Sequence, residues 1–261
     1  MHRSIYSTIL VTIIIFLVFF SSPLYAAHTI IITCKYFKEF RTHIGEVPVC
    51  FVISNESIIY DETYITSISH SNKTLTKDSK TKHFATLNKF YHFIPQGLAD
   101  IFDKLQGLEI VHSKLKVVRL KDMQGHIHLE YLNLRGNDIE CVDGDVFTNN
   151  FKLKFISLAD NKIRRIDTKI FLNLLYIQQI YLNGNYCSSH KANSRQEVIS
   201  MKESLKLNCA PLYSKSGVPM KCEQLVKLEM EKYDSRKLNQ KFENEHKINS
   251  ELKEQLEMQT I

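Results

Sequence analysis

The chain has 261 residues, of which 44% are hydrophobic and 24% charged, as in a globular protein rather than a disordered one. Its formal net charge of +6 is a mild excess spread along the chain, so we expect no nucleic-acid partner. Eight Gly and five Pro exclude a collagenous sequence.

Residues 1–27 have the pattern of a secretory signal peptide. A basic start (His2, Arg3) precedes an unbroken run, apolar apart from one Thr, over residues 9–20, and small residues follow up to Ala27. A signal anchor is the alternative, but a bilayer-spanning helix needs about 20 apolar residues. The pattern therefore predicts a secreted, extracellular protein with no stable membrane span.

Six cysteines in an exported chain favour disulfides over metal ligation. The sequence has no Cys-x-x-Cys pair, and we expect neither a metal site nor a cofactor. Two N-x-[ST] sequons, at Asn55 and Asn72, predict glycosylation.

Residues 28–80 predict an N-terminal cap. Two runs rich in β-branched residues, 30–34 and 49–53, predict strands separated by a charged stretch. We expect a disulfide between Cys34 and Cys50 to join them.

A period of 24 residues organises residues 81–186. Residues 129–139 fit the pattern L-x-x-L-x-L-x-x-N-x-L, and residues 81–104 predict an irregular first coil. Copies of the pattern, each 24 residues from the next, begin at Leu105, Leu129, Leu153 and Ile177. Such phasing predicts short strands whose alternate Leu side chains point inward, with the Asn bonding backbone groups of neighbouring coils.

Residues 187–209 predict a C-terminal cap. Ser194 and Glu197 form a capping box that predicts a helix to about Leu207. Cys187 and Cys209 bracket this helix, and we expect them to pair. The fold class predicted is an α/β solenoid: a short leucine-rich-repeat array with disulfide caps at both ends, followed by a C-terminal helix.

Cys141 and Cys222 leave three hypotheses open. They could pair with each other, either could be a free thiol, or Cys222 could form an intermolecular disulfide, which is the hypothesis we favour. Cys141 is expected to face outward, because it lies between core positions.

After a linker at residues 210–221, residues 222–261 contain no Pro or Gly and predict a charged helix. A short intermolecular coiled coil, a solvated helix packed on its own domain, and disorder all remain possible interpretations. With Cys222, the first of these predicts a homodimer or heterodimer.

Residues 28–209 resemble the secreted leucine-rich-repeat proteins of mosquitoes and related flies, which include mosquito leucine-rich-repeat immune proteins. The likeness lies in the N-terminal Cys pair, residues 93–102, the phased repeats, and residues 183–187 with Cys209. It implies a role in insect innate immunity, with two chains joined through cysteines and a coiled coil that hold a protein partner.

Partner binding is predicted on the concave sheet, through side chains that flank the inward Leu positions. Tyr131, Phe155 and Tyr181 are expected to form one aromatic column beside Arg135, although cross-strand packing would also explain them. The candidate partner-binding residues are Glu109, Tyr131, Asn133, Arg135, Phe155, Asp160 and Tyr181.

No catalytic motif is present, so we expect no enzyme. The predicted function is a secreted, non-catalytic protein-binding module of innate immunity, with an extracellular protein as its partner. The alternative is an extracellular structural or developmental ligand-binding protein with no immune role.

Overall fold

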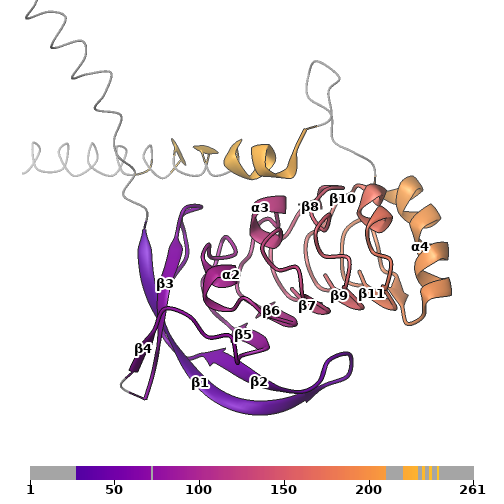
Figure 1. Cartoon of the computed structure of the whole chain (residues 1–261). Helices are drawn as coiled ribbons and strands as arrows, with labels where there is room; N and C mark the ends of the chain where they lie inside the picture. Colours follow the sequence, from indigo (N-terminus) through magenta and orange to yellow (C-terminus); the bar gives the residue numbers. More distant parts are fainter. Residues whose placement is uncertain are drawn as a thin grey trace, which may run out of the picture.

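The computed structural model describes residues 28–71, 73–209, 220–228, 231–232, 235–236 and 240. The predicted signal peptide, Asn72, most of the linker and most of the expected C-terminal helix lie outside the described residues. Within the described part, the fold is a short leucine-rich-repeat solenoid, as predicted (Figure 1).

Short strands alternate with turns and brief helices along the chain. The elements in order are β1 (Thr29–Arg41), β2 (Gly45–Val52), β3 (Tyr64–His70), β4 (Lys73–Leu75), β5 (His83–Leu87), α2 (Leu98–Ile101), β6 (Gly107–Val111), α3 (Leu120–Met123), β7 (Tyr131–Asn133), β8 (Cys141–Val142), β9 (Phe155–Ser157), β10 (Arg165–Ile166), the 3-10 helix η1 (Thr168–Leu172), β11 (Gln179–Tyr181), β12 (Lys191–Ala192) and α4 (Arg195–Asn208).

One long sheet forms the concave side of the array. Among the described residues its strand order is β12-β11-β9-β7-β6-β5-β2-β1-β3-β4, and β5, β6, β7, β9 and β11 are parallel. Leu108, Leu132, Ile156 and Ile180 are paired in register 24 residues apart and are at most 1% exposed. The 24-residue period therefore stacks each coil's inward side chains on those of the next.

Asparagines at the repeat position bond the backbone between coils. Asn161 Oδ1 accepts a hydrogen bond from Ile139 N–H at 3.1 Å, and its Nδ2 donates to the carbonyl oxygens of Leu134 (2.9 Å) and Leu158 (3.1 Å). Asn137 makes the same type of bonds one coil earlier. These side chains satisfy backbone groups that would otherwise be buried without partners.

The N-terminal cap is a longer hairpin than the sequence predicts. β1 and β2 pair antiparallel from Cys34 with Val52 to Arg41 with Gly45, so the strands continue through the stretch expected to separate them. That stretch still alternates outward and inward side chains, which a strand tolerates despite the charge. Cys34 and Cys50 form the expected disulfide.

At the other end, Ser194 caps α4 by accepting a hydrogen bond from Glu197 N–H, as the capping box predicts. Val198, Met201 and Leu205 are the buried face of this helix. Cys187 and Cys209 form the expected disulfide.

The favoured hypothesis for Cys222 is wrong in this structure, because Cys222 forms a disulfide with Cys141 of the same chain. Cys141 is 2% exposed rather than outward-facing, since it belongs to β8, which pairs with β10 on the opposite side of the coils. Asp143 Oδ2 accepts a hydrogen bond from Cys222 N–H at 3.0 Å, which fixes the second cysteine in place.

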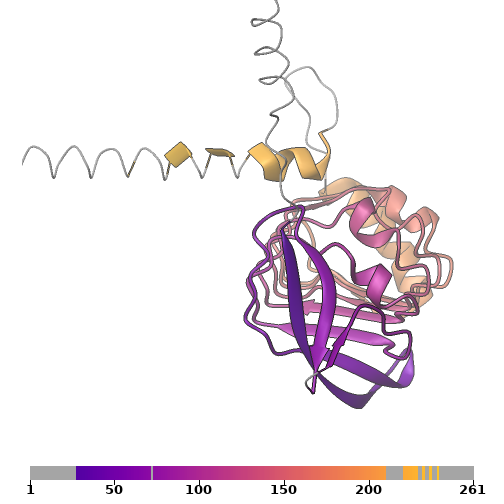
Figure 2. The same ribbon diagram turned by 60° about the vertical axis from the view of Figure 1, so that its left-hand side comes forward.

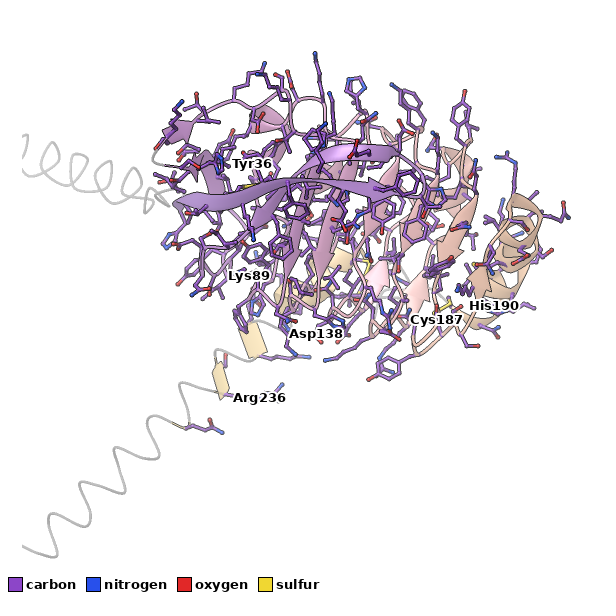
Figure 3. All side chains as sticks on the ribbon, turned by 90° about the horizontal axis from the view of Figure 1, so that it is seen from below. Tyr36, Lys89, Asp138, Cys187, His190 and Arg236 are labelled. Atoms are coloured by element: carbon purple, nitrogen blue, oxygen red, sulfur yellow. A yellow bond between two sulfur atoms is a disulfide. The ribbon has the colours of Figure 1, made fainter. Side chains whose placement is uncertain are left out.

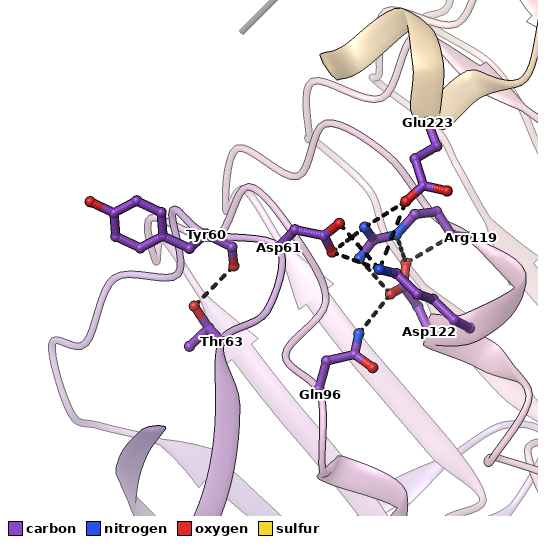
Figure 4. A network of polar contacts seen from close by, with 8 residues as sticks. Tyr60, Asp61, Thr63, Gln96, Arg119, Asp122 and Glu223 are labelled. Atoms are coloured by element: carbon purple, nitrogen blue, oxygen red, sulfur yellow. Dashed lines mark hydrogen bonds and ion pairs between the residues drawn. The ribbon is translucent and has the colours of Figure 1, made fainter. Parts of the chain in front are cut away.

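Residues 222–228 are helical and contact the N-terminal part of the array through a polar network. Arg119 forms a bidentate contact with Asp122 (2.9 and 2.7 Å), pairs with Asp61, and lies 3.5 Å from Glu223 (Figure 4). Figures 1 and 2 both show this helix on the side of the array away from the β1–β2 turn. The concave sheet is therefore left free of it.

In the part of the chain that the structure describes, no helix is long and apolar enough to cross a membrane. Within the same residues, no cluster of three or more His, Cys, Asp or Glu could hold a metal ion.

Candidate partner-binding face

The concave face carries two columns of outward side chains along its parallel strands. The first column follows the strand starts, with Tyr131 opposite Phe155 and Phe155 opposite Gln179. The second column lies two residues further along and pairs Asn133 with Ser157 and Ser157 with Tyr181. Tyr181 is therefore not in the column of Tyr131 and Phe155, and that detail of the prediction is wrong.

The β1–β2 hairpin crosses the concave strands (Figure 3). Its tip, residues 41–45, contacts the first column through His43. The His43 ring is stacked on Phe155 with centroids 5.3 Å apart, and its Nε2 is 3.2 Å from Gln179 Oε1. The Tyr131 ring also stacks on Phe155 at 4.7 Å. As a result Phe155 is only 8% exposed, so the expectation that it is an exposed anchor is wrong.

A charged group secures the base of this tip. Glu109 Oε1 lies 2.8 Å from Arg41 Nε and 3.0 Å from His83 Nε2, and its side chain is 13% exposed. Asn133 Nδ2 donates to its other oxygen at 3.3 Å. Burial alone would raise the pKa of Glu109, but the contacts with His83, Arg41 and Asn133 outweigh it and lower the pKa. Glu109 therefore serves the hairpin rather than facing solvent.

Tyr131 is covered by the same tip, because its ring centroid lies 6.4 Å from that of His43. Burial, and next the charge of Glu109, raise its phenol pKa to about 12. This phenol therefore stays protonated at physiological pH, and its ring acts as a packing surface for the hairpin.

Apart from the buried Ser157, the second column and the turn after it remain accessible. Arg135 Nε lies 2.7 Å from Asp160 Oδ2, and these side chains are 57% and 38% exposed. Tyr181 is half-buried, donates to Asn193 Oδ1 at 3.1 Å, and lies under Lys191 Nζ at 4.5 Å. The accessible concave face is thus a polar surface of Asn133, Arg135, Asp160 and Tyr181.

Backbone geometry fixes the Asp160 side of this surface. Asp160 has a φ of +55°, and Gly184, 24 residues later, has a φ of +74°. A Cβ on Gly184 would lie 2.2 Å from Asp160 Oδ1, so only Gly leaves room for that carboxylate. Asp is one of the few residue types that adopt this backbone conformation with a side chain.

Sequence reasoning missed the part that the hairpin plays in this face. Arg41 and His43 lie in a charged stretch with no repeat phasing, and nothing in it indicates which surface the strands would reach. The sequence offers no signal for this contact, because the pairing of β1 with β2 as far as Arg41 and Gly45, beyond the residues that pair with β5, is seen only in the structure. Asn55, one of the predicted glycosylation sites, lies exposed after β2.

The leucine rich repeat family model matches residues 127–187. Two chicken (Gallus gallus) proteins, Toll-like receptor 2 type-2 and type-1, are 32% and 31% identical to the chain over 93 residues. These 93 residues are 36% of this chain and only 12% and 11% of the two receptors. The chain therefore spans a small part of the curated relatives it matches.

Two solved structures are similar at lower identity. Toll in its complex with Spatzle, from Drosophila, is 19% identical with a TM-score of 0.40, over 42% of this chain and 15% of that one. The leucine-rich-repeat ectodomain of the receptor kinase SOBIR1 from Arabidopsis thaliana is 14% identical with a TM-score of 0.34, over 58% and 79% of the two chains.

Proposed function

We propose that this chain is a secreted, non-catalytic module that binds an extracellular protein on the accessible part of its concave face. The observation that carries the proposal is the exposed Arg135–Asp160 ion pair with Asn133 and Tyr181 on the same surface. Arg and Tyr are enriched among the residues that dominate binding energy at protein interfaces. The hairpin tip borders this surface, so its outer side would meet the same partner.

We also propose that the module acts in innate immunity. The resemblance to insect leucine-rich-repeat immune proteins implies this role, and the likeness to Toll-like receptor 2 over 93 residues supports it. An extracellular structural or developmental protein would use the same face. Induction of the gene by microbial challenge would favour the immune role, whereas constant expression in one tissue would favour the alternative.

The binding proposal is tested by two matched double variants. R135A/D160A removes the concave ion pair, and D138A/K162A removes a pair of similar length (2.8 Å) between adjacent coils just beyond the concave strands. Each variant loses one positive and one negative charge, so net charge does not change. Each secreted protein would be immobilised and used to capture proteins from the extracellular fluid of its source.

We expect the wild type and D138A/K162A to capture the same partner. The affinity of R135A/D160A for that partner should be at least tenfold lower. Truncating a hot-spot residue costs about 2 kcal/mol or more, which is roughly a thirtyfold loss of affinity. Equal capture by all three proteins would refute a concave site. Circular dichroism would confirm that both variants are folded.

A further inference from the structure

A second polar site lies on the rim of the array, beside the concave face. It is a pocket of about 180 Å³ beside the N-terminal ends of four neighbouring strands, β5, β6, β7 and β9. The residues that line it recur at 24-residue intervals from coil to coil. They are Lys82, Lys104, Gln106, His128, Glu130 and Lys152.

The charge of this pocket is strongly positive. Among the described residues, no carboxylate oxygen lies within 4.0 Å of the ammonium groups of Lys82, Lys104 and Lys152. The carboxylate in the lining, Glu130, is already paired with Lys154. Four lysines against one glutamate leave an excess of three positive charges in and beside the pocket.

Two basic side chains of the pocket are held against each other. Lys152 Nζ lies 3.2 Å from His128 Nδ1. An ammonium can only donate, so Nδ1 accepts and the ring proton is on Nε2, which is left as a further donor. The pocket therefore combines ammonium and imidazole donors. Lys82, His128 and Lys152 are partly buried, and Lys104 in the pocket lining is exposed.

Partly buried ammonium groups without a carboxylate partner lose hydration, and an anionic ligand would restore that lost stabilisation. Sulfate offers several acceptor oxygens to such donors. Lys104 and Lys152 lie two coils apart, which places their backbones about 10 Å apart at a strand spacing of about 4.8 Å. A ligand that carries several anionic groups along its length could reach both.

We propose that this rim pocket binds the sulfate groups of a sulfated polysaccharide. The disulfides of the chain are those of a protein from an oxidising compartment, where such polysaccharides occur. The volume accommodates one charged group and part of a sugar ring rather than a folded protein surface. The site is separate from the Arg135–Asp160 surface, so the two can be tested independently.

The test uses the complete secreted chain and a heparin-derived octasaccharide, with its desulfated form as the comparison ligand. Calorimetric titration would measure binding by the wild type, by K104A/K152A and by the matched control K73A/K169A. The control lowers net charge equally but changes exposed lysines outside the pocket. K104Q/K152Q repeats the test if the alanine variant is not folded.

We expect K104A/K152A to weaken octasaccharide binding at least tenfold and the control to weaken it less than twofold. Binding should weaken with salt, and the salt dependence should be shallower for K104A/K152A because fewer counterions are released. Equal losses of octasaccharide binding in the two variants would show that the ligand is attracted by net charge alone, and this would overturn the proposal. Equal binding of the desulfated form would also overturn it, as would binding of inositol hexaphosphate without binding of the octasaccharide.

Discussion

Asn161→Ala is expected to lower the free energy of unfolding of the array by an amount that can be worked out from the hydrogen bonds of this side chain. Asn161 is 6% exposed, accepts a bond from Ile139 N–H, and donates to the carbonyl oxygens of Leu134, Leu158 and Ala159. In the variant, Leu134 O keeps its bond from Asn137 and Leu158 O keeps its bond from Asn185. Ala159 O keeps its bond from Gly136 N–H. Ile139 N–H alone is left buried without its acceptor.

An unpartnered buried N–H costs about 1–3 kcal/mol, and the lost bonds to the carbonyl oxygens, which all keep another donor, add about 1 kcal/mol. We therefore expect Asn161→Ala to lower the free energy of unfolding by about 3 kcal/mol. For a domain of this size, that corresponds to a fall in Tm of roughly 6–12 °C.

Asn185→Ala is the matched control at the end of the ladder. Asn185 makes the corresponding bonds to Ile163 N–H (3.0 Å), Leu158 O (2.9 Å) and Leu182 O (2.8 Å), but it is only partly buried. Water can replace these bonds, so we expect a loss of about 1 kcal/mol. Urea unfolding followed by circular dichroism measures both variants. Equal losses, or a loss below 1 kcal/mol for Asn161→Ala, would refute the reasoning.

Three further perturbations test other parts of the structure. Cys222→Ser is expected to lower the free energy of unfolding by about 4.5 kcal/mol in the chain-entropy model, because the disulfide to Cys141 spans 81 residues. Urea unfolding measures this loss. A disulfide-linked dimer of the wild type on a non-reducing gel would contradict the pairing. Burial lowers the pKa of His126 to about 4 from an ordinary value of 6.5, so below pH 6.5 the unfolded chain binds a proton that the native chain does not. Stability should therefore fall between pH 6.5 and pH 4, by up to about 3 kcal/mol, and His126→Phe should flatten this slope in unfolding curves. Arg41→Ala removes the ion pair between the hairpin tip and Glu109. Amides of the tip should then exchange hydrogen faster, while those of β9 do not change. Unchanged exchange in the tip would show that this ion pair does not hold the tip in place.

The repeat array was predictable because the contacts that stabilise it join neighbouring coils and recur at a fixed interval in the sequence. Each coil must bury its Leu side chains against the next, and each Asn must bond the backbone of its neighbour, so both appear at fixed 24-residue intervals. The capping box at Ser194 is local too, and it places the start of α4 correctly.

Contacts between non-repeating segments were not predictable in this way. Cys141 pairs with Cys222 because residues 220–222 reach β8 and are held by Asp143, a relation with no sequence period. The covering of Phe155 by His43 likewise depends on how far the hairpin twists over the sheet. The sequence could show that Phe155 points to the concave side, but not that another segment would cover it.

Hydrogen exchange of the complex with its captured partner tests the central claim most directly. We predict slower exchange on binding in the amides of β7, β9 and β11, in the turns at residues 134–136 and 158–160, and in the hairpin tip at residues 41–45. Residues 141–150, which begin with β8 on the other side of the coils, should not change. Protection confined to residues 141–150 or to α4, with the concave strands unaltered, would contradict a concave binding face.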